Sequence, residues 1–180
     1  MNERSFNNTI YLLVGGITVF ILSILMWDYF HGGVPSHHLL ANENLPEISN
    51  WWGVITLPLF SYFLLMRMKK RLNNEDQNKN LFLLPFFFSL LYAITLAVSF
   101  STGNTKISSL LFQSIPLIAL FFPIYLSEYL LGFIIGLVYT FGGVLPIIIG
   151  GVIAIISYII YNYLRSFILF ISTKIGIIKR

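Results

Sequence analysis

The sequence contains no cysteine, which excludes disulfide bonds, iron–sulfur clusters and thiol nucleophiles. Charged residues are also scarce: they make up 10% of the 180 residues, against roughly a quarter in an average soluble domain. Hydrophobic residues, in contrast, make up 57%, and the mean hydropathy is +0.81. This composition excludes an ordinary soluble protein and predicts an all-α, polytopic transmembrane helical bundle that forms one domain over residues 1–180.

Familiar catalytic motifs are missing as well. The sequence has no HExxH zincin motif, no GxSxG nucleophile elbow and no P-loop. Its net charge of +4 and isoelectric point near 9.4 do not indicate nucleic acid, because the basic residues lie outside the apolar runs and form no stripe. We therefore expect the lipid bilayer as a partner of the chain, and no nucleic acid.

Six apolar stretches are candidates for membrane spans, because a crossing needs roughly 20 mostly apolar residues. The first is too long for a signal peptide and ends at Trp27, Asp28 and Tyr29, so we interpret it as an uncleaved anchor. Basic residues from Arg67 to Arg71 end the second. The expected spans cover residues 9–30, 51–66, 81–100, 107–126, 128–142 and 145–171.

The last three spans are divisions of one nearly continuous apolar stretch, residues 107–171. At about 20 residues per crossing, this stretch accommodates three helices with tight turns. We place the breaks near Ser127–Glu128 and at Gly142–Gly143, shortly before Pro146, because glycine and proline interrupt helices.

Lysine and arginine predict the orientation, because cytoplasmic loops carry an excess of both. With six spans and both termini in the cytoplasm, only Lys106 lies outside. The cytoplasmic side, including a basic loop over 67–80, then holds Arg4, Arg67, Lys69, Lys70, Arg71, Lys79, Lys174, Lys179 and Arg180. Five spans would move the last three of these residues outside, so the asymmetry favours six. A bacterial inner membrane is the default expectation.

Two charged residues and one glycine pair inside the apolar stretch predict helix contacts. Glu128 is expected at the cytoplasmic boundary, where Arg165, near the end of the last span, is a candidate ion-pair partner. Gly132 and Gly136 form a GxxxG pair, which lets helices approach closely in lipid. We expect this pair to pack within the chain; a helix of a partner chain is the alternative.

The expected outer loop, residues 31–50, carries all three histidines of the chain. Asp28 and His31 are three residues apart and share a face if the first helix continues to Phe30. Gly32–Gly33 then turns the chain, and Ser36 is a candidate N-cap. We therefore expect either a short interfacial helix or a structured loop between the first two spans, the helix beginning at His37.

Three interpretations of this loop stay open. In the first, Asp28, His31, His37 and His38 bind a divalent metal, with zinc as the leading candidate. Glu43 or Glu47 is then the candidate catalytic base. In the second, the same groups form a proton-titratable or gating site, because imidazole titrates near neutral pH. In the third, the loop is structural, and its polar groups cap helix ends and bond to one another.

The sequence thus predicts a multi-pass integral membrane protein with a candidate functional Asp/His loop on the extracytoplasmic side. Two functional alternatives accompany this prediction. One is a metal-assisted hydrolase or transferase that acts at the membrane. The other is a transporter or an accessory subunit of a membrane complex. No motif names a substrate, and no cofactor other than a divalent metal is indicated.

Overall fold

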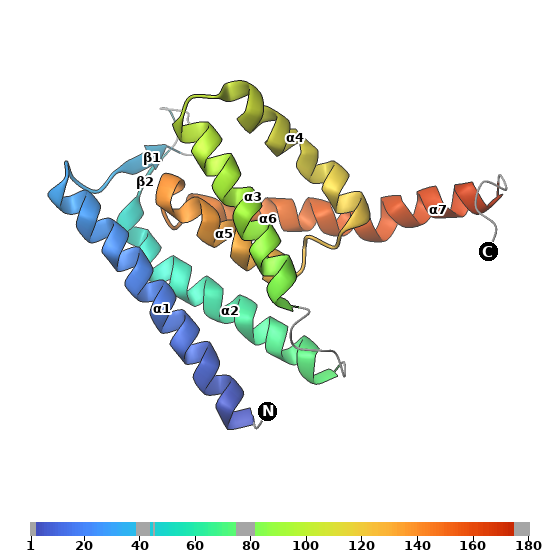
Figure 1. Ribbon diagram of the computed structural model, residues 1–180, viewed down its shortest axis with the longest axis horizontal. Coiled ribbons are helices and arrows are strands. Elements are labelled where there is room, and N and C mark those ends of the chain that lie inside the picture. Colours follow the sequence, from blue (N-terminus) through green and yellow to red (C-terminus); the bar gives the residue numbers. More distant parts are fainter. Residues whose placement is uncertain (1–2, 39–43, 45, 75–81, 175–180) are drawn as a thin grey trace.

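The computed structural model describes residues 3–38, 44, 46–74 and 82–174. These residues form a helical bundle with one small hairpin (Figure 1). The helices are α1 (Glu3–Phe30), α2 (Gly53–Asn74), α3 (Leu83–Ser101), α4 (Thr105–Phe121), α5 (Ser127–Phe141), α6 (Leu145–Ile159) and α7 (Arg165–Lys174). A 3-10 turn, η2 (Asn50–Trp52), precedes α2, and a π-helical segment, η4 (Ile160–Leu164), joins α6 to α7. The predicted helical architecture is confirmed.

Four helical stretches of the described chain are long and apolar enough to cross a membrane: Phe6–Phe30, Asn50–Leu72, Leu83–Ser101 and Leu145–Ile171. Two further apolar helices, α4 and α5, have 17 and 15 residues. At 1.5 Å per residue they are roughly 25 and 22 Å long, short of a hydrocarbon core of about 30 Å. Length and composition therefore support four spans, where the sequence predicted six.

The helix bounds explain why α4 and α5 are short. The chain leaves α4 at Phe122, in an extended conformation just before Pro123, and α5 starts at Ser127. It leaves α5 at Gly142, which has a φ of 72°. These ends coincide with the breaks expected near Ser127–Glu128 and at Gly142–Gly143, so the turns themselves consume part of the apolar stretch.

Helices α1 to α6 run in alternating directions between two ends of the bundle, and α7 continues α6 through η4. At the first end, Lys69 of α2 donates a 2.7 Å hydrogen bond to Asn7 of α1. At the same end, Arg71 contacts Glu128 of α5 and stacks on Phe82, just before α3. We call this the basic end. At the opposite end, which we call the loop end, the hairpin meets the turn between α5 and α6.

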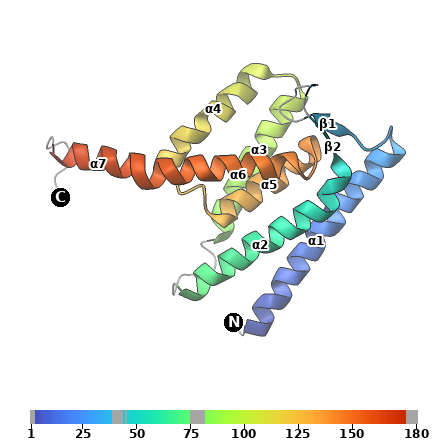
Figure 2. The same ribbon diagram turned by 180° about the vertical axis from the view of Figure 1, so that it is seen from behind.

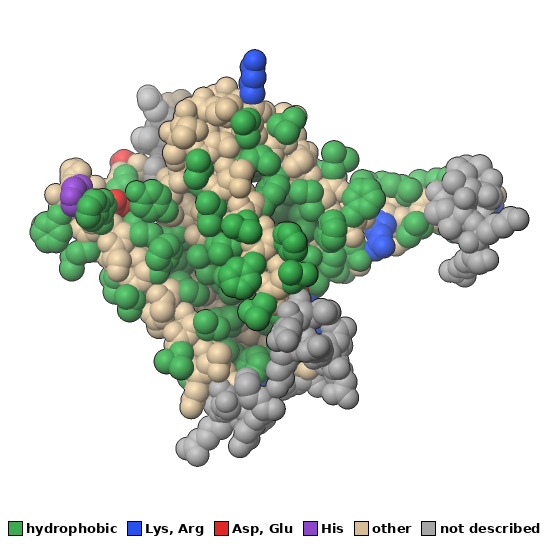
Figure 3. All heavy atoms as spheres, in the orientation of Figure 1, with side chains coloured by type: hydrophobic (Ala, Val, Ile, Leu, Met, Phe, Trp, Pro, Cys, Tyr) green, Lys and Arg blue, Asp and Glu red, His purple; other side chains and the backbone are tan. Residues whose placement is uncertain are grey.

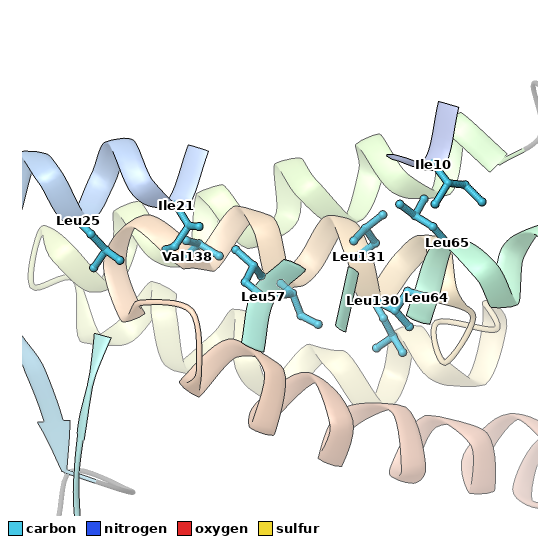
Figure 4. Packing of buried hydrophobic residues seen from close by; sticks show 10 residues of the cluster. Ile10, Ile21, Leu25, Leu57, Leu64, Leu65, Leu130, Leu131 and Val138 are labelled. Atoms are coloured by element: carbon cyan, nitrogen blue, oxygen red, sulfur yellow. The ribbon is translucent and has the colours of Figure 1, made fainter. Parts of the chain in front are cut away.

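The buried core lies on both sides of α5. One cluster of buried residues joins it to α1 and α2: Ile10, Ile21, Leu25, Leu57, Leu64, Leu65, Leu130, Leu131, Ile134 and Val138 (Figure 4). A second joins it to α3 and α4: Ala93, Leu96, Ala97, Ile115, Phe133 and Leu137. The outside of the molecule is itself apolar, with few charged groups on the face shown in Figure 3. This distribution fits a protein surrounded by lipid.

The two glycines of the GxxxG pair lie against α3 of the same chain. A Cβ atom at Gly132 would lie 2.3 Å from the Phe86 carbonyl oxygen, and one at Gly136 would lie 2.6 Å from the Ala93 Cβ. The backbones of α3 and α5 therefore approach as closely as small residues allow. In Figures 1 and 2, α7 projects away from this packed region.

Candidate functional site

The loop between α1 and α2 is a short antiparallel hairpin. Strand β1 (Ser36–His38) pairs with β2 (Glu47–Ser49) in the register Ser36↔Ser49, His37↔Ile48 and His38↔Glu47. The expected interfacial helix starting at His37 is therefore wrong for this segment. Its backbone bonds run across to β2, and Ser36, the expected N-cap, instead donates its hydroxyl hydrogen to the Glu47 carboxylate. This bond occupies one oxygen of a candidate catalytic base.

His31 follows the last residue of α1, where the chain turns toward the hairpin. The backbone N–H groups of His31 and Gly33 both bond to the Asp28 carbonyl, at 3.1 and 2.9 Å. Gly32 and Gly33 have φ values of 126° and 99°, a region that glycine enters without strain. The expected turn at the two glycines is thus what ends α1.

The His31 ring has a defined tautomer. Its Nδ1 lies 2.8 Å from the Trp27 carbonyl oxygen, which can only accept, so Nδ1 carries the hydrogen. The ring also stacks on the Trp27 indole, with centroids 3.9 Å apart and planes 15° apart. In the neutral imidazole, Nε2 therefore keeps its lone pair. A backbone carbonyl that holds Nδ1–H is a common arrangement in metal-ligating histidines.

The base of the hairpin is fixed against the rest of the bundle. The Asn50 backbone N–H bonds to the Pro35 carbonyl at 3.2 Å, and its side chain is buried. A Cβ atom at Gly142 would lie 2.1 Å from the Asn50 side-chain oxygen, and one at Gly143 would lie 2.5 Å from the Gly53 Cα. We call this contact the loop lock. It holds the hairpin against the turn between α5 and α6.

The expected metal ligands are only partly within the described structure. Asp28 and His31 lie at the end of α1, whereas the side chains of His37 and His38 and the whole of Glu43 lie outside the described residues. Among the side chains that are described, no three His, Asp or Glu groups are grouped to hold a metal ion. Glu47, which pairs in register with His38, bonds to Ser36.

A second polar site lies at the basic end. The Glu128 side chain is 4% exposed, and its Oε1 accepts a 2.5 Å hydrogen bond from Arg71. Its Oε2 is buried without a hydrogen-bond partner in the described structure. The expected pairing with Arg165 is wrong: that guanidinium lies 4.5 Å from the centre of the Tyr161 ring. Arg71 reaches Glu128 because α2 and α5 pack side by side, with Arg71 in the last turn of α2.

Sequence reasoning missed the residues of the loop lock. Asn50 looked like an ordinary loop residue and Gly53 like the start of a span, and nothing in their spacing points to residues in the turn after α5. The Gly142–Gly143 pair was the available signal, since two adjacent glycines often mark a close backbone approach as well as a turn.

These features together define a membrane-embedded helical protein with a hairpin fixed at one end and a buried ion pair at the other. No protein-family model, curated protein or solved structure matches this chain.

Proposed function

We propose that this chain is a six-crossing membrane protein with both termini in the cytoplasm. The alternation of helix direction supports this topology. The ion pair between α2 and α5 ties the start of α5 to the basic end, and the loop lock ties its end to the loop end. Because α5 extends between the same two ends as the longer helices α1 and α2, it crosses the same membrane layer as they do in this proposal. Lys69, Lys70 and Arg71 at the basic end then give the cytoplasmic excess of positive charge.

The functional site in this proposal is the extracytoplasmic loop over residues 31–50, with His31 as its central group. The observation that carries it is the hydrogen bond from His31 Nδ1 to the Trp27 carbonyl, since it leaves Nε2 as a lone-pair donor on an exposed ring. Nε2 of His31 then binds a divalent cation such as zinc, with Asp28, His37 and His38 as further ligands. The loop lock supports this role because holding the base of the hairpin at Asn50 lowers the cost of ordering the ligands.

Zinc content of the purified protein tests the proposal. We expect about one zinc per chain by inductively coupled plasma mass spectrometry after dialysis against trace metal, and a loss of most of it in His31→Gln. Tyr29→Phe, in the last turn of α1, is the matched control and should keep its zinc. A metal-free wild-type protein that is helical and monodisperse would exclude the metal site. The alternative function as a metal-assisted hydrolase requires the same zinc, with Glu43 or Glu47 as the catalytic base. The zinc measurement therefore tests this alternative as well.

An accessory subunit that presents the hairpin to a protein partner is a second candidate. The loop lock favours it, because a hairpin whose base is already held at Asn50 loses less conformational entropy when it binds. A photo-crosslinking amino acid at Val34 in cells should give one discrete adduct, whereas one at Thr102, in the α3–α4 turn, should give none. Equal labelling from both positions would count against a partner for the hairpin.

A further inference from the structure

The last helix, α7, continues α6 through η4 and extends past the packed part of the bundle (Figures 1 and 2). The three segments α6, η4 and α7 have 15, 5 and 10 residues, so together they are roughly 45 Å long at 1.5 Å per residue. The first two alone are roughly 30 Å long, which already equals the thickness of a hydrocarbon core. The residues of α7 are therefore more than a single crossing needs.

Aromatic side chains mark the level at which α7 begins. The ring of Tyr125, in the turn between α4 and α5, lies 5.2 Å from the Tyr158 ring and 5.9 Å from the Tyr161 ring, centre to centre. This turn belongs to the basic end, because Glu128 follows it at the start of α5. Tyrosine is enriched where membrane helices meet the headgroup layer. The three rings therefore indicate that α7 starts at the membrane surface on the side of the basic end.

One face of α7 is apolar and exposed. It consists of Phe167, Ile168 and Ile171, which are 60%, 44% and 38% exposed. Spacings of four and three residues place Ile171 beside both of the others. In water this face would be a contiguous apolar surface, which proteins seldom leave uncovered. Helices that pack against each other in lipid approach through small residues, and α7 contains neither glycine nor alanine. The acyl chains of lipid therefore suit this face better than a second helix does.

A second face, at the start of the same helix, is polar. Asn162, Arg165 and Ser166 repeat these spacings, and the Ser166 hydroxyl donates a 2.7 Å hydrogen bond to the Asn162 carbonyl. The Arg165 guanidinium lies 4.5 Å from the centre of the Tyr161 ring, and Lys174 ends the helix. At about 100° per residue, the centres of the two faces are nearly opposite. An apolar face opposite a cationic one is typical of helices that lie in the headgroup layer.

We propose that α7 is an interfacial helix, which lies in the phospholipid headgroup layer at the basic end. Phe167, Ile168 and Ile171 then enter the acyl chains, and Arg165 contacts lipid phosphate. In Figure 1 the line of α6 and α7 runs across the directions of α1 and α2, so α7 leaves the bundle at an incline. An inclined helix stays in the headgroup layer over more of its length. The proposal concerns the end opposite to the histidine loop, and it depends neither on zinc nor on the side of the membrane that the basic end faces.

Because the chain has no cysteine, a single nitroxide spin label can be attached at any chosen position of α7. Two adjacent exposed residues supply a matched pair: Ser166→Cys on the polar face and Phe167→Cys on the apolar face. The full chain is labelled and placed in vesicles of palmitoyl-oleoyl phosphatidylcholine and phosphatidylglycerol. Power saturation then compares access to oxygen, which enters the hydrocarbon, with access to a water-soluble nickel chelate. We expect the oxygen-to-nickel ratio to be at least about threefold higher at residue 167 than at residue 166.

Two further labels keep the test decisive if one variant of the pair disturbs the fold, which circular dichroism detects. Ile171→Cys should repeat the result of Phe167→Cys one turn further along α7. Val19→Cys, at a 64% exposed position in the middle of α1, supplies the ratio for hydrocarbon, and Ser166→Cys should fall well below it. Equally high ratios at residues 166, 167 and 171 would place α7 inside the hydrocarbon, and equally low ratios would place it in water. Low access to both reagents at all three would place it against a partner or a second copy. Each of these three results would overturn the proposal.

Discussion

The two short helices, α4 and α5, are similar in length and opposite in environment. Ten residues of α5 are buried, and its neighbours reach it through an ion pair, two glycine contacts and the loop lock. In α4 only Ile115 and Ala119 are buried, and a cavity lies along one side. In lipid, apolar side chains alone do not drive helices together, so close backbone approach and polar contacts decide which helix is held firmly.

The largest expected effect comes from breaking the ion pair of α5. Arg71→Ala leaves the buried Glu128 carboxylate without its partner, which should cost about 3–5 kcal/mol in the free energy of unfolding. Unfolding by sodium dodecyl sulfate in mixed micelles, followed by circular dichroism, measures it. Arg67→Ala, an exposed residue of the same helix, is the control and should change little. Adding Glu128→Gln to Arg71→Ala should recover part of the loss, and no recovery would contradict this account of the pair.

An intermediate effect is expected at the contact between α3 and α5. Gly132→Ala places a Cβ atom 2.3 Å from the Phe86 carbonyl oxygen, so the two helices must separate, at about 1–3 kcal/mol. Gly151→Ala is the matched control, because its Cβ would have no neighbour within 4 Å. The same unfolding assay compares the two. Equal stability of both variants would mean that α3 and α5 are not in the close contact described above.

The smallest effect is expected for α4. Its Pro116 cannot donate the helical hydrogen bond to the Phe112 carbonyl, and Tyr92 of α3 donates to the adjacent Leu111 carbonyl. Tyr92→Phe should therefore cost about 0.5–1.5 kcal/mol. Tyr139→Phe, at a side chain that is 73% exposed, is the reference. A loss for Tyr92→Phe as large as that for Gly132→Ala would remove the contrast between α4 and α5.

The helices and the breaks between them could be predicted from the sequence, because both depend on local sequence signals. Apolar runs predicted α1, α2 and α3, and glycine and serine near residues 127 and 142 predicted the ends of α5. The number of helices long enough to span the membrane could not be predicted in the same way, because turn residues shorten α4 and α5 below the length that the apolar stretch suggested.

The site was less predictable, because its contacts join residues far apart in the chain. Pairing between β1 and β2 replaced the expected helix at His37, although Ser36 is a good N-cap by its local sequence. Arg71 and Arg165 were both expected at the same end of the bundle, and only the packing of α2 against α5 decides which one meets Glu128.

The loop lock also has a consequence for biosynthesis. Asn50 and Gly53 leave the ribosome early, whereas their partners Gly142 and Gly143 emerge only after α3, α4 and α5 have been made. Contacts between residues this distant form late, since the intervening chain must be ordered first. A nascent chain that stops before Gly142 already contains every histidine, but it lacks the two glycines that contact the base of the hairpin. The loop that is translated early is thus among the last parts to reach its final position.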